Sequence, residues 1–152
     1  MSEKEQRQTV VKALRALDAH SVENRVGPGT PDINYVHGWI ETKCLKKWPV
    51  RASTPVQLAH DLTQGQRIWL MRRWETGGEA YVLLQAEKDW LIFDAPTACR
   101  LIGTATKDEL LDGATMVWLG KKLFEQEVAE WLSRRAISRT GSGSSSTGDA
   151  RH

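Results

Sequence analysis

The chain has little cysteine, and its two cysteines, Cys44 and Cys99, are far apart and form no CxxC motif. This spacing argues against a structural zinc site and a disulfide scaffold, and it favours a reducing compartment such as the cytoplasm. The sequence also lacks an apolar run of membrane-spanning length, and its charged N-terminus does not resemble a signal peptide. We therefore expect a cytoplasmic protein with no membrane partner.

Charge of one sign is also scarce, because 21 Lys and Arg residues face 19 Asp and Glu residues, for a net charge of +2. This total is too small to demonstrate nucleic-acid binding, so any such function must depend on where the cations lie. The four histidines are scattered and form no pair with metal-ligand spacing. A length of 152 residues fits a single domain around one core.

Residues 29–43, with the sequence GTPDINYVHGWIETK, predict a β-hairpin. The segments 33–36 and 39–42 are rich in β-branched and aromatic side chains, which favour strands. Between them, His37-Gly38 has the length and the glycine of a two-residue hairpin turn. The sequence therefore predicts two antiparallel strands joined at this dipeptide.

The predicted turn determines which residues of the hairpin face each other. Asn34 is expected opposite Glu41, and Asp32 is expected opposite Lys43. Because opposed residues in an antiparallel pair share a face, all four polar side chains project from one side. The other side is apolar, so we expect it to pack on the core while the charged side borders a cleft.

Asp32 and Glu41 have the chemistry of ligands for a hard divalent cation. Mg²⁺ takes oxygen ligands and is usually held by one or two carboxylates together with waters and a substrate phosphate. The backbone carbonyl of Thr42 is a further candidate oxygen ligand. The ammonium of Lys43 is expected to orient the attacking water and to offset charge that develops at phosphorus. The alternative is a solvated hairpin face on which the acids and the lysine merely pair.

The pattern Gly-x-Pro-Asp, a turn and an apolar strand ending in Ile-Glu-Thr-Lys resembles the signature of the PD-(D/E)XK nuclease superfamily. Asp32 and Glu41-Thr42-Lys43 stand at the matching positions. Over roughly the first 85 residues, the chain looks most like the compact VRR-NUC and Holliday-junction-resolvase-like nucleases of bacteriophages and some repair enzymes. The resemblance implies an α/β fold with a mixed central sheet and flanking helices, as in restriction endonucleases, and Mg²⁺ or Mn²⁺ as the cofactor.

In the resembled families a helix that bears a glutamate precedes the Pro-Asp, and Glu3 is our candidate for it. Residues 3–19 predict a helix with Ser2 as its N-cap and an apolar stripe that includes Val10. Glu3 falls on this stripe and is expected to face inward, whereas Glu5 falls nearly opposite and is expected in solvent. The alternative is an acid that is favoured only by the helix dipole, at a chain end that frays.

The same families have a glutamine at the start of the helix after Glu-x-Lys, and Gln66 is our candidate. Thr63 precedes an amphipathic segment that ends at Gly77-Gly78, which predicts an N-capped helix. The resemblance implies that Gln66 lies near the metal and the scissile phosphate. Thr63-x-x-Gln66 is also a capping box, in which Gln66 bonds back to the Thr63 backbone. Both interpretations remain open at the level of sequence.

Basic residues cluster just after the predicted active strand. Lys46, Lys47 and Arg51 follow it, Trp48 lies among them, and Arg67 stands on the next helix. We expect the cations to contact DNA phosphates and Trp48 to stack on an exposed base or to wedge a junction. The alternatives are a solvated basic face and a Trp48 that packs under its own loop.

The remainder of the chain predicts an α/β extension, residues 86–137, within a nuclease domain that spans residues 1–137. We expect a short helix at 55–59, strands at 80–85, 90–93 and 115–119, a helix that starts at 106, and an amphipathic helix at 124–136. Val128, Trp131 and Leu132 of the last helix are expected to cover the sheet or to contact a second protomer. Gly, Ser and Thr dominate from Arg139 on, which predicts a disordered tail over 138–152.

Together these patterns predict a metal-dependent DNA endonuclease that hydrolyses phosphodiester bonds. By resemblance, the expected substrate is branched DNA such as a four-way junction. Resolving a junction takes two active sites, so the expected partner, besides DNA, is a second copy of the chain. One alternative is a general or restriction-type nuclease that cuts linear duplex. The other is a catalytically silent DNA-binding or virion-associated protein of the same fold.

Overall fold

The computed structural model describes residues 2–23 and 27–149, with side chains up to residue 139. Six strands form one sheet in the order β1-β2-β3-β4-β5-β6. They are β1 (His20–Ser21), β2 (Ile33–Tyr35), β3 (Gly38–Leu45), β4 (Glu79–Ala86), β5 (Asp89–Asp94) and β6 (Met116–Leu119). β3 and β4 are parallel and the other neighbours are antiparallel, so the sheet is mixed.

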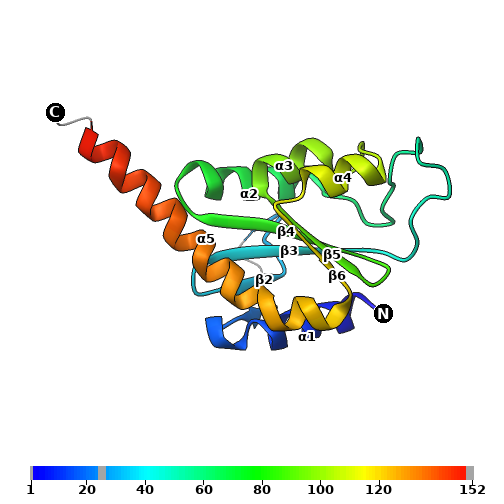
Figure 1. The fold of residues 1–152 in the computed structure, drawn as a ribbon, viewed down its shortest axis with the longest axis horizontal. Helices are drawn as coiled ribbons and strands as arrows, with labels where there is room; N and C mark the ends of the chain where they lie inside the picture. The colour runs from blue at the N-terminus through cyan, green and yellow to red at the C-terminus, as the bar shows by residue number, and fades with distance from the viewer. Residues whose placement is uncertain (1, 24–26, 150–152) are drawn as a thin grey trace.

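Helices cover both faces of the sheet, as Figure 1 shows. On one face lie α2 (Gln64–Glu75), α3 (Ala95–Leu101) and α4 (Lys107–Gly113). On the other lie α1 (Glu3–Ala13) and the long α5 (Lys121–Asp149). This arrangement confirms the predicted α/β fold with a mixed central sheet and flanking helices. No helix in the described part of the chain is long and apolar enough to cross a membrane.

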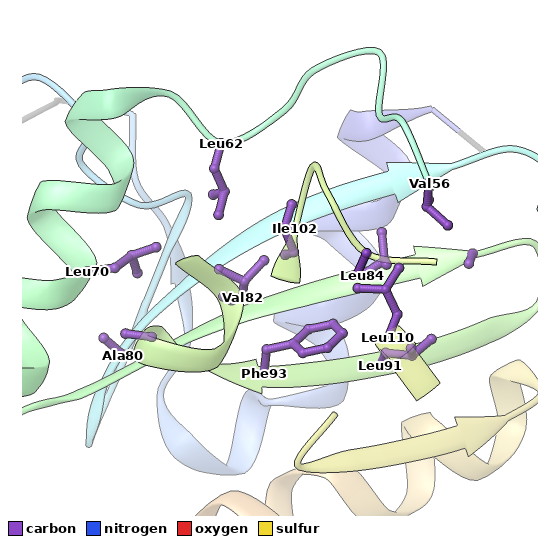
Figure 2. Packing of buried hydrophobic residues seen from close by; sticks show 14 of the residues in the cluster. Val56, Leu62, Leu70, Ala80, Val82, Leu84, Leu91, Phe93, Ile102 and Leu110 are labelled. Atoms are coloured by element: carbon purple, nitrogen blue, oxygen red, sulfur yellow. The ribbon is translucent and has the colours of Figure 1, made fainter. Parts of the chain in front are cut away.

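The strand at the centre of this arrangement, β4, is buried along its whole length. Because successive side chains of a strand point to opposite faces, β4 supplies two separate cores. Val82 and Leu84 pack beneath α2, α3 and α4 together with Leu91 and Phe93 of β5 (Figure 2). A strand covered on both faces is typical of parallel pairing with a crossover helix, here α2 between β3 and β4.

The second core lies between the sheet and the α1/α5 layer. Trp90 of β5 stacks on Phe124 of α5, with ring centroids 4.1 Å apart, and Trp118 of β6 meets Phe124 edge-on. Val128 and Leu132 of α5 are buried in the same core. They cover the sheet, which was one of the two roles predicted for them, and α5 is therefore part of the same folding unit as β4 and β5.

The hairpin forms, but its predicted turn is wrong. Tyr35 pairs with Gly38, so the turn residues are Val36 and His37, and the register places Asn34 opposite Trp39. Gly38 lies inside β3, where a Cβ would stand 2.0 Å from the carbonyl oxygen of Glu79. The glycine thus permits the close approach of β4, which is a different use from the turn that the sequence suggested.

The corrected register keeps the predicted faces of the hairpin. It differs from the prediction by two residues, and because side chains alternate with a period of two, an even shift leaves each on its expected side. Ile33, Tyr35 and Ile40 pack in the core beneath α1 and α5, as predicted for the apolar face. In the observed register, Asp32 lies next to Glu41 rather than opposite Lys43 as predicted.

Two predicted segments differ from the structure, and one helix was missed. α1 ends at Ala13 rather than near residue 19, and a 3-10 turn, Arg15–Leu17, carries the chain toward β1. Residues 55–59 contain no helix and belong to an irregular loop. α3 was not predicted, although Asp94 caps its N-terminus by accepting a hydrogen bond from the Thr97 N–H.

The predicted disordered tail, 138–152, is corrected at its start, because α5 continues through Ser138 and Arg139 to Asp149. Arg139 is held by three contacts with the body of the protein. Its guanidinium carbon lies 3.5 Å from the centroid of Trp74, its Nη2 donates to the Trp74 carbonyl at 2.7 Å, and its Nε lies 3.7 Å from Glu79 Oε1. Residues 150–152 lie outside the described chain.

The stacked Trp90 and Phe124 give a direct test of whether α5 belongs to the core. Phe124→Ala should lower the free energy of unfolding by about 3–5 kcal/mol, because it removes a buried ring and leaves a cavity. Leu123→Ala, one residue earlier and exposed, should cost about 1 kcal/mol or less. Urea denaturation of both variants would measure this, and equal losses would show that α5 is only loosely attached.

Candidate active site

A cleft of about 410 Å³ lies beside the second half of β3, beyond the residues that pair with the much shorter β2. It brings together all the residues predicted for catalysis and metal binding, namely Glu3, Asp32, Glu41, Thr42, Lys43 and Gln66. Four further residues line it, namely Arg7, His60, Asp61 and Thr63. Segments from α1, the hairpin, the loop before α2 and α2 itself thus converge on one site.

Glu41 and Lys43 stand two residues apart on β3 and therefore on the same face of the sheet. Their side chains are only 2% and 8% exposed, and Lys43 Nζ lies 3.8 Å from Glu41 Oε2. A solvated acid-lysine pair, the alternative at the level of sequence, does not describe this geometry. Two charges withdrawn from water need each other and further polar partners, since an uncompensated buried charge is strongly destabilising.

Gln66, in the first turn of α2, supplies those further partners. Its Nε2 donates to Glu41 Oε2 at 3.1 Å, and its Oε1 accepts from Lys43 Nζ at 3.2 Å. The same Oε1 accepts from the Thr63 N–H at 3.0 Å, while Thr63 Oγ1 accepts from the Gln66 N–H. The capping box and the contact with the site, left open as alternatives, thus occur together, and the cap orients the amide between the acid and the lysine.

The Asp32 carboxylate is hydrogen-bonded to Thr42, the residue of β3 between Glu41 and Lys43. The N–H of Thr42 donates to Asp32 Oδ2 at 3.1 Å, and the Thr42 hydroxyl donates to the same oxygen at 2.8 Å. β2 begins only at Ile33, so at this point the Asp32 side chain bonds the β3 backbone. The carboxylate is thereby held at the mouth of the cleft beside Glu41.

Gln6 of α1 also supports the site and was missed by the sequence analysis. Its side chain is 1% exposed, its Nε2 donates to the Lys43 carbonyl at 2.7 Å, and its Oε1 accepts from the Cys44 thiol at 2.8 Å. Burial raises the pKa of that thiol, and the negative charge of Glu3 adds to the effect. Gln6 precedes the buried Val10 by one helical turn, so its place on the apolar stripe was the available signal.

Glu3 lies at the rim of the cleft rather than inside it. Its side chain is 63% exposed, and its Oε1 is 3.8 Å from His60 Nε2. The prediction that Glu3 faces inward is therefore corrected, although it does line the cleft. Glu5 caps the helix through Ser2, whose backbone N–H and hydroxyl lower the pKa of the Glu5 carboxyl.

Two of the predicted DNA contacts have structural roles. Trp48 is 8% exposed and packs in the core beneath α2–α4, which agrees with the alternative that it lies under its own loop. Arg67 donates to the carbonyls of Cys99 at 2.7 Å and Ile102 at 3.2 Å, where it satisfies the C-terminal end of α3. The prediction that Trp48 stacks on an exposed base is therefore corrected. Arg67 keeps 26% of its side chain exposed, and its contact with DNA stays a prediction.

The other predicted DNA contacts, Lys46, Lys47 and Arg51, are exposed on the loop that follows β3. None of them lines the cleft. The same loop returns to the site at its far end, where the Asp61 carbonyl accepts from Lys43 Nζ at 3.4 Å. Their role in binding DNA stays a prediction.

The donor set of the cleft fits a hard divalent cation. Within residues 2–23 and 27–149 no group of three or more His, Cys, Asp and Glu side chains is arranged to hold a metal. Asp32 and Glu41 supply two carboxylates, which is the usual protein contribution to Mg²⁺ when waters and substrate phosphate complete the coordination. Carboxylate oxygen favours Mg²⁺ or Mn²⁺ over metals that prefer sulfur or nitrogen.

No protein-family model and no curated protein matches the chain. Among solved structures, the chain is similar to Hjc of Archaeoglobus fulgidus, a Holliday junction resolvase from an archaeal hyperthermophile. The two share 21% sequence identity with a TM-score of 0.52, over 85% of this chain and 98% of Hjc. The likeness confirms the restriction-endonuclease-like fold class, and it extends beyond the first 85 residues that carried the sequence resemblance.

Gly29 provides a test of how the cleft is held together. It has a φ of +82°, and a Cβ there would lie 2.1 Å from the carbonyl oxygen of Gly65 in the first turn of α2. Gly77 is a matched control, with a φ of +95° and open space around its Cβ position. Gly77→Ala should cost about 1–2 kcal/mol of unfolding free energy from backbone strain alone.

Gly29→Ala should cost about 1–3 kcal/mol more than the control, because the backbone of α2 must also move. Urea denaturation of both variants, with circular dichroism as the signal, would measure the difference. Equal losses in the two variants would contradict the close contact between the Pro28-Gly29 loop and α2.

Proposed function

We propose that the chain is a metal-dependent endonuclease that hydrolyses phosphodiester bonds in DNA and acts on branched DNA. The observation that carries the proposal is the Gln66 amide, which bonds both Glu41 and Lys43 in a cleft where Asp32 is also held. A buried acid and lysine are costly to maintain, and a fold that only binds DNA has no need of them there. Metal-assisted hydrolysis of a phosphodiester uses such groups, carboxylates to hold the ion and a cation to stabilise the developing charge.

In this proposal Asp32 and Glu41 hold Mg²⁺ or Mn²⁺, with the Thr42 carbonyl as a further ligand. When bound, the ion supplies Lewis-acid polarisation of the phosphate and activation of a water. Asp32 is kept in place by two hydrogen bonds from Thr42, and Glu41 by the amide of Gln66. Both carboxylates are thus oriented before substrate arrives, which reduces the reorganisation needed during the reaction.

Lys43 is the residue that we assign to water and to the developing charge. Its ammonium is oriented by two neutral acceptors, Gln66 Oε1 and the Asp61 carbonyl, and lies 3.8 Å from Glu41 Oε2. A fixed cation beside the scissile phosphate stabilises the extra negative charge of the transition state. Water attacks phosphorus directly, so the proposal includes no covalent enzyme intermediate. Glu3, at the rim, is proposed to complete the outer part of the site.

Branched DNA is proposed as the substrate because Hjc, which has the same fold, is a Holliday junction resolvase. Two symmetric cuts across a four-way junction require two active sites, so the proposal includes a homodimer. The cytoplasmic location stays a prediction from the sequence, and a bacteriophage origin rests only on the resemblance to phage nucleases. A restriction-type nuclease of this fold differs by cutting linear duplex as readily, and a silent DNA-binding protein differs by binding without metal.

Cleavage of a labelled four-way junction beside a matched linear duplex, with and without Mg²⁺, separates these possibilities. We expect metal-dependent cutting of the junction that falls about 100-fold or more in Asp32→Asn, because a ligand carboxylate is lost. Asp112→Asn, an exposed aspartate outside the cleft, should cut like the wild type. Equal cutting of both substrates would remove the junction claim, and metal-independent binding without cutting by any protein would favour the silent binder.

Gln66→Ala separates catalysis from helix capping. The variant should lose about 1 kcal/mol of stability from the capping box and about 1–3 kcal/mol more because the buried Glu41 and Lys43 each lose a hydrogen bond. Its cleavage rate should fall about 10–100-fold, because the acid and the lysine lose the amide that orients them. Glu109→Ala removes the equivalent residue of the capping box in α4 and lies outside the cleft. It should lose only the capping-box share of stability and retain full cleavage. Equal rates in the two variants would contradict a role for Gln66 in the site.

A further inference from the structure

A second groove, of about 550 Å³, lies between the outer face of α1 and the edge strand β1. Four cations line it, namely Lys4, Arg7, Lys12 and Arg15. Arg7 also lines the catalytic cleft, so the groove and the cleft meet at this side chain. The sequence analysis did not identify this surface, because the cations are spread over the helix rather than adjacent in the chain.

The four cations are available for a ligand. Among the described residues, none of them makes an ion pair with a carboxylate. Two acids also line the groove, but Asp18 is 2.9 Å from His20 Nε2 and Glu23 is exposed. By contrast, Arg67 is engaged by backbone carbonyls at the end of α3. The groove therefore has an excess of positive charge beside the proposed reaction centre.

The length of the basic face suits a nucleic-acid strand. Lys4 and Lys12 are separated by eight residues of α1, which corresponds to about 12 Å at the helical rise of 1.5 Å per residue, and Arg15 extends the face into the 3-10 turn that follows. Along the duplex axis one strand advances about 3.4 Å per nucleotide, so the face is long enough to contact several successive phosphates. On the opposite wall, His20 and Ser21 of β1 are exposed and offer polar groups to phosphate or sugar oxygens.

We propose that the α1–β1 groove binds the phosphates of the DNA strand on one side of the scissile phosphate. Arg7 contacts the phosphate nearest the cleft, and Lys12 and Arg15 contact those farther along the strand. The inference rests on the proposed nuclease function, which places the scissile phosphate in the cleft. It makes α1, rather than the 46–51 loop, the principal DNA-contacting element.

The test is the salt dependence of binding, measured with Asp32→Asn protein so that the DNA stays intact. Fluorescence anisotropy of a labelled four-way junction between 50 and 200 mM NaCl gives the slope of log K against log salt, which falls by about 0.7–0.9 for each phosphate contact removed. Lys12→Gln/Arg15→Gln should lower the slope by about 1.4–1.8. Arg100→Gln/Lys122→Gln, with the same charge change outside both cavities, should leave it unchanged.

Lys46→Gln/Lys47→Gln tests the rival surface with the same loss of charge. The proposed binding of DNA in the groove would be overturned if the slope fell in this variant and not in Lys12→Gln/Arg15→Gln. It would also be overturned if Lys12→Gln/Arg15→Gln and the parent protein gave equal slopes. The lysines and arginines replaced in these variants are all exposed, so we expect each variant to unfold at the same temperature as the Asp32→Asn parent. Thermal unfolding measurements then check that the fold is retained.

Cleavage assays with Asp32 intact distinguish failure of the groove from failure of the proposed function. The groove variant should raise KM about tenfold and change kcat less than about threefold, because Lys12 and Arg15 hold DNA away from the reacting atoms. Cutting with an unchanged KM and salt slope would reject the groove while the nuclease stands. A reduced slope in a protein that cuts no DNA would reject the nuclease while the groove stands as a DNA-binding surface.

Discussion

The buried ion pair between Glu41 and Lys43 is the constraint on which the rest of the site depends. Neither charge is tolerable alone away from water, so the fold must deliver several polar groups to the same point. Gln66 comes from the capped start of α2, and the Asp61 carbonyl comes from the loop before it. Gln6 of α1 fixes the backbone at Lys43 itself. All of these hydrogen bonds are made to Glu41 or Lys43 of β3.

The topology of the sheet explains why this costly pair lies at a cleft. β3 continues past the short β2, so one side of its second half has no neighbouring strand. Asp32 bonds β3 at Thr42, the second position beyond the paired region, and α1 and α2 approach from the two layers. Two carboxylates and a lysine thus meet in the cleft beside this half of β3, where we propose that a phosphodiester binds.

Local patterns predicted the hairpin, its two faces and the shared face of Asp32, Glu41 and Lys43, because alternation along strands is encoded by neighbouring residues. Glu3 and Gln66 were assigned to the site through the resemblance to the PD-(D/E)XK nucleases. The turn was wrong because Gly38 is required by the close approach of Glu79, a contact between segments distant in sequence. The structural roles of Trp48 and Arg67 were missed because they also depend on contacts between segments distant in sequence. Their polar or aromatic character was visible, but the core and the end of α3 that engage them were not.

The central claim is that Asp32 and Glu41 form one divalent-metal site beside Lys43. Electron paramagnetic resonance of Mn²⁺, titrated into the protein with an uncleavable four-way junction, tests this claim most directly. We predict saturable binding that is lost in Glu41→Gln, a variant of nearly identical shape that lacks the negative charge. Mn²⁺ binding that is unchanged in Glu41→Gln would contradict the account.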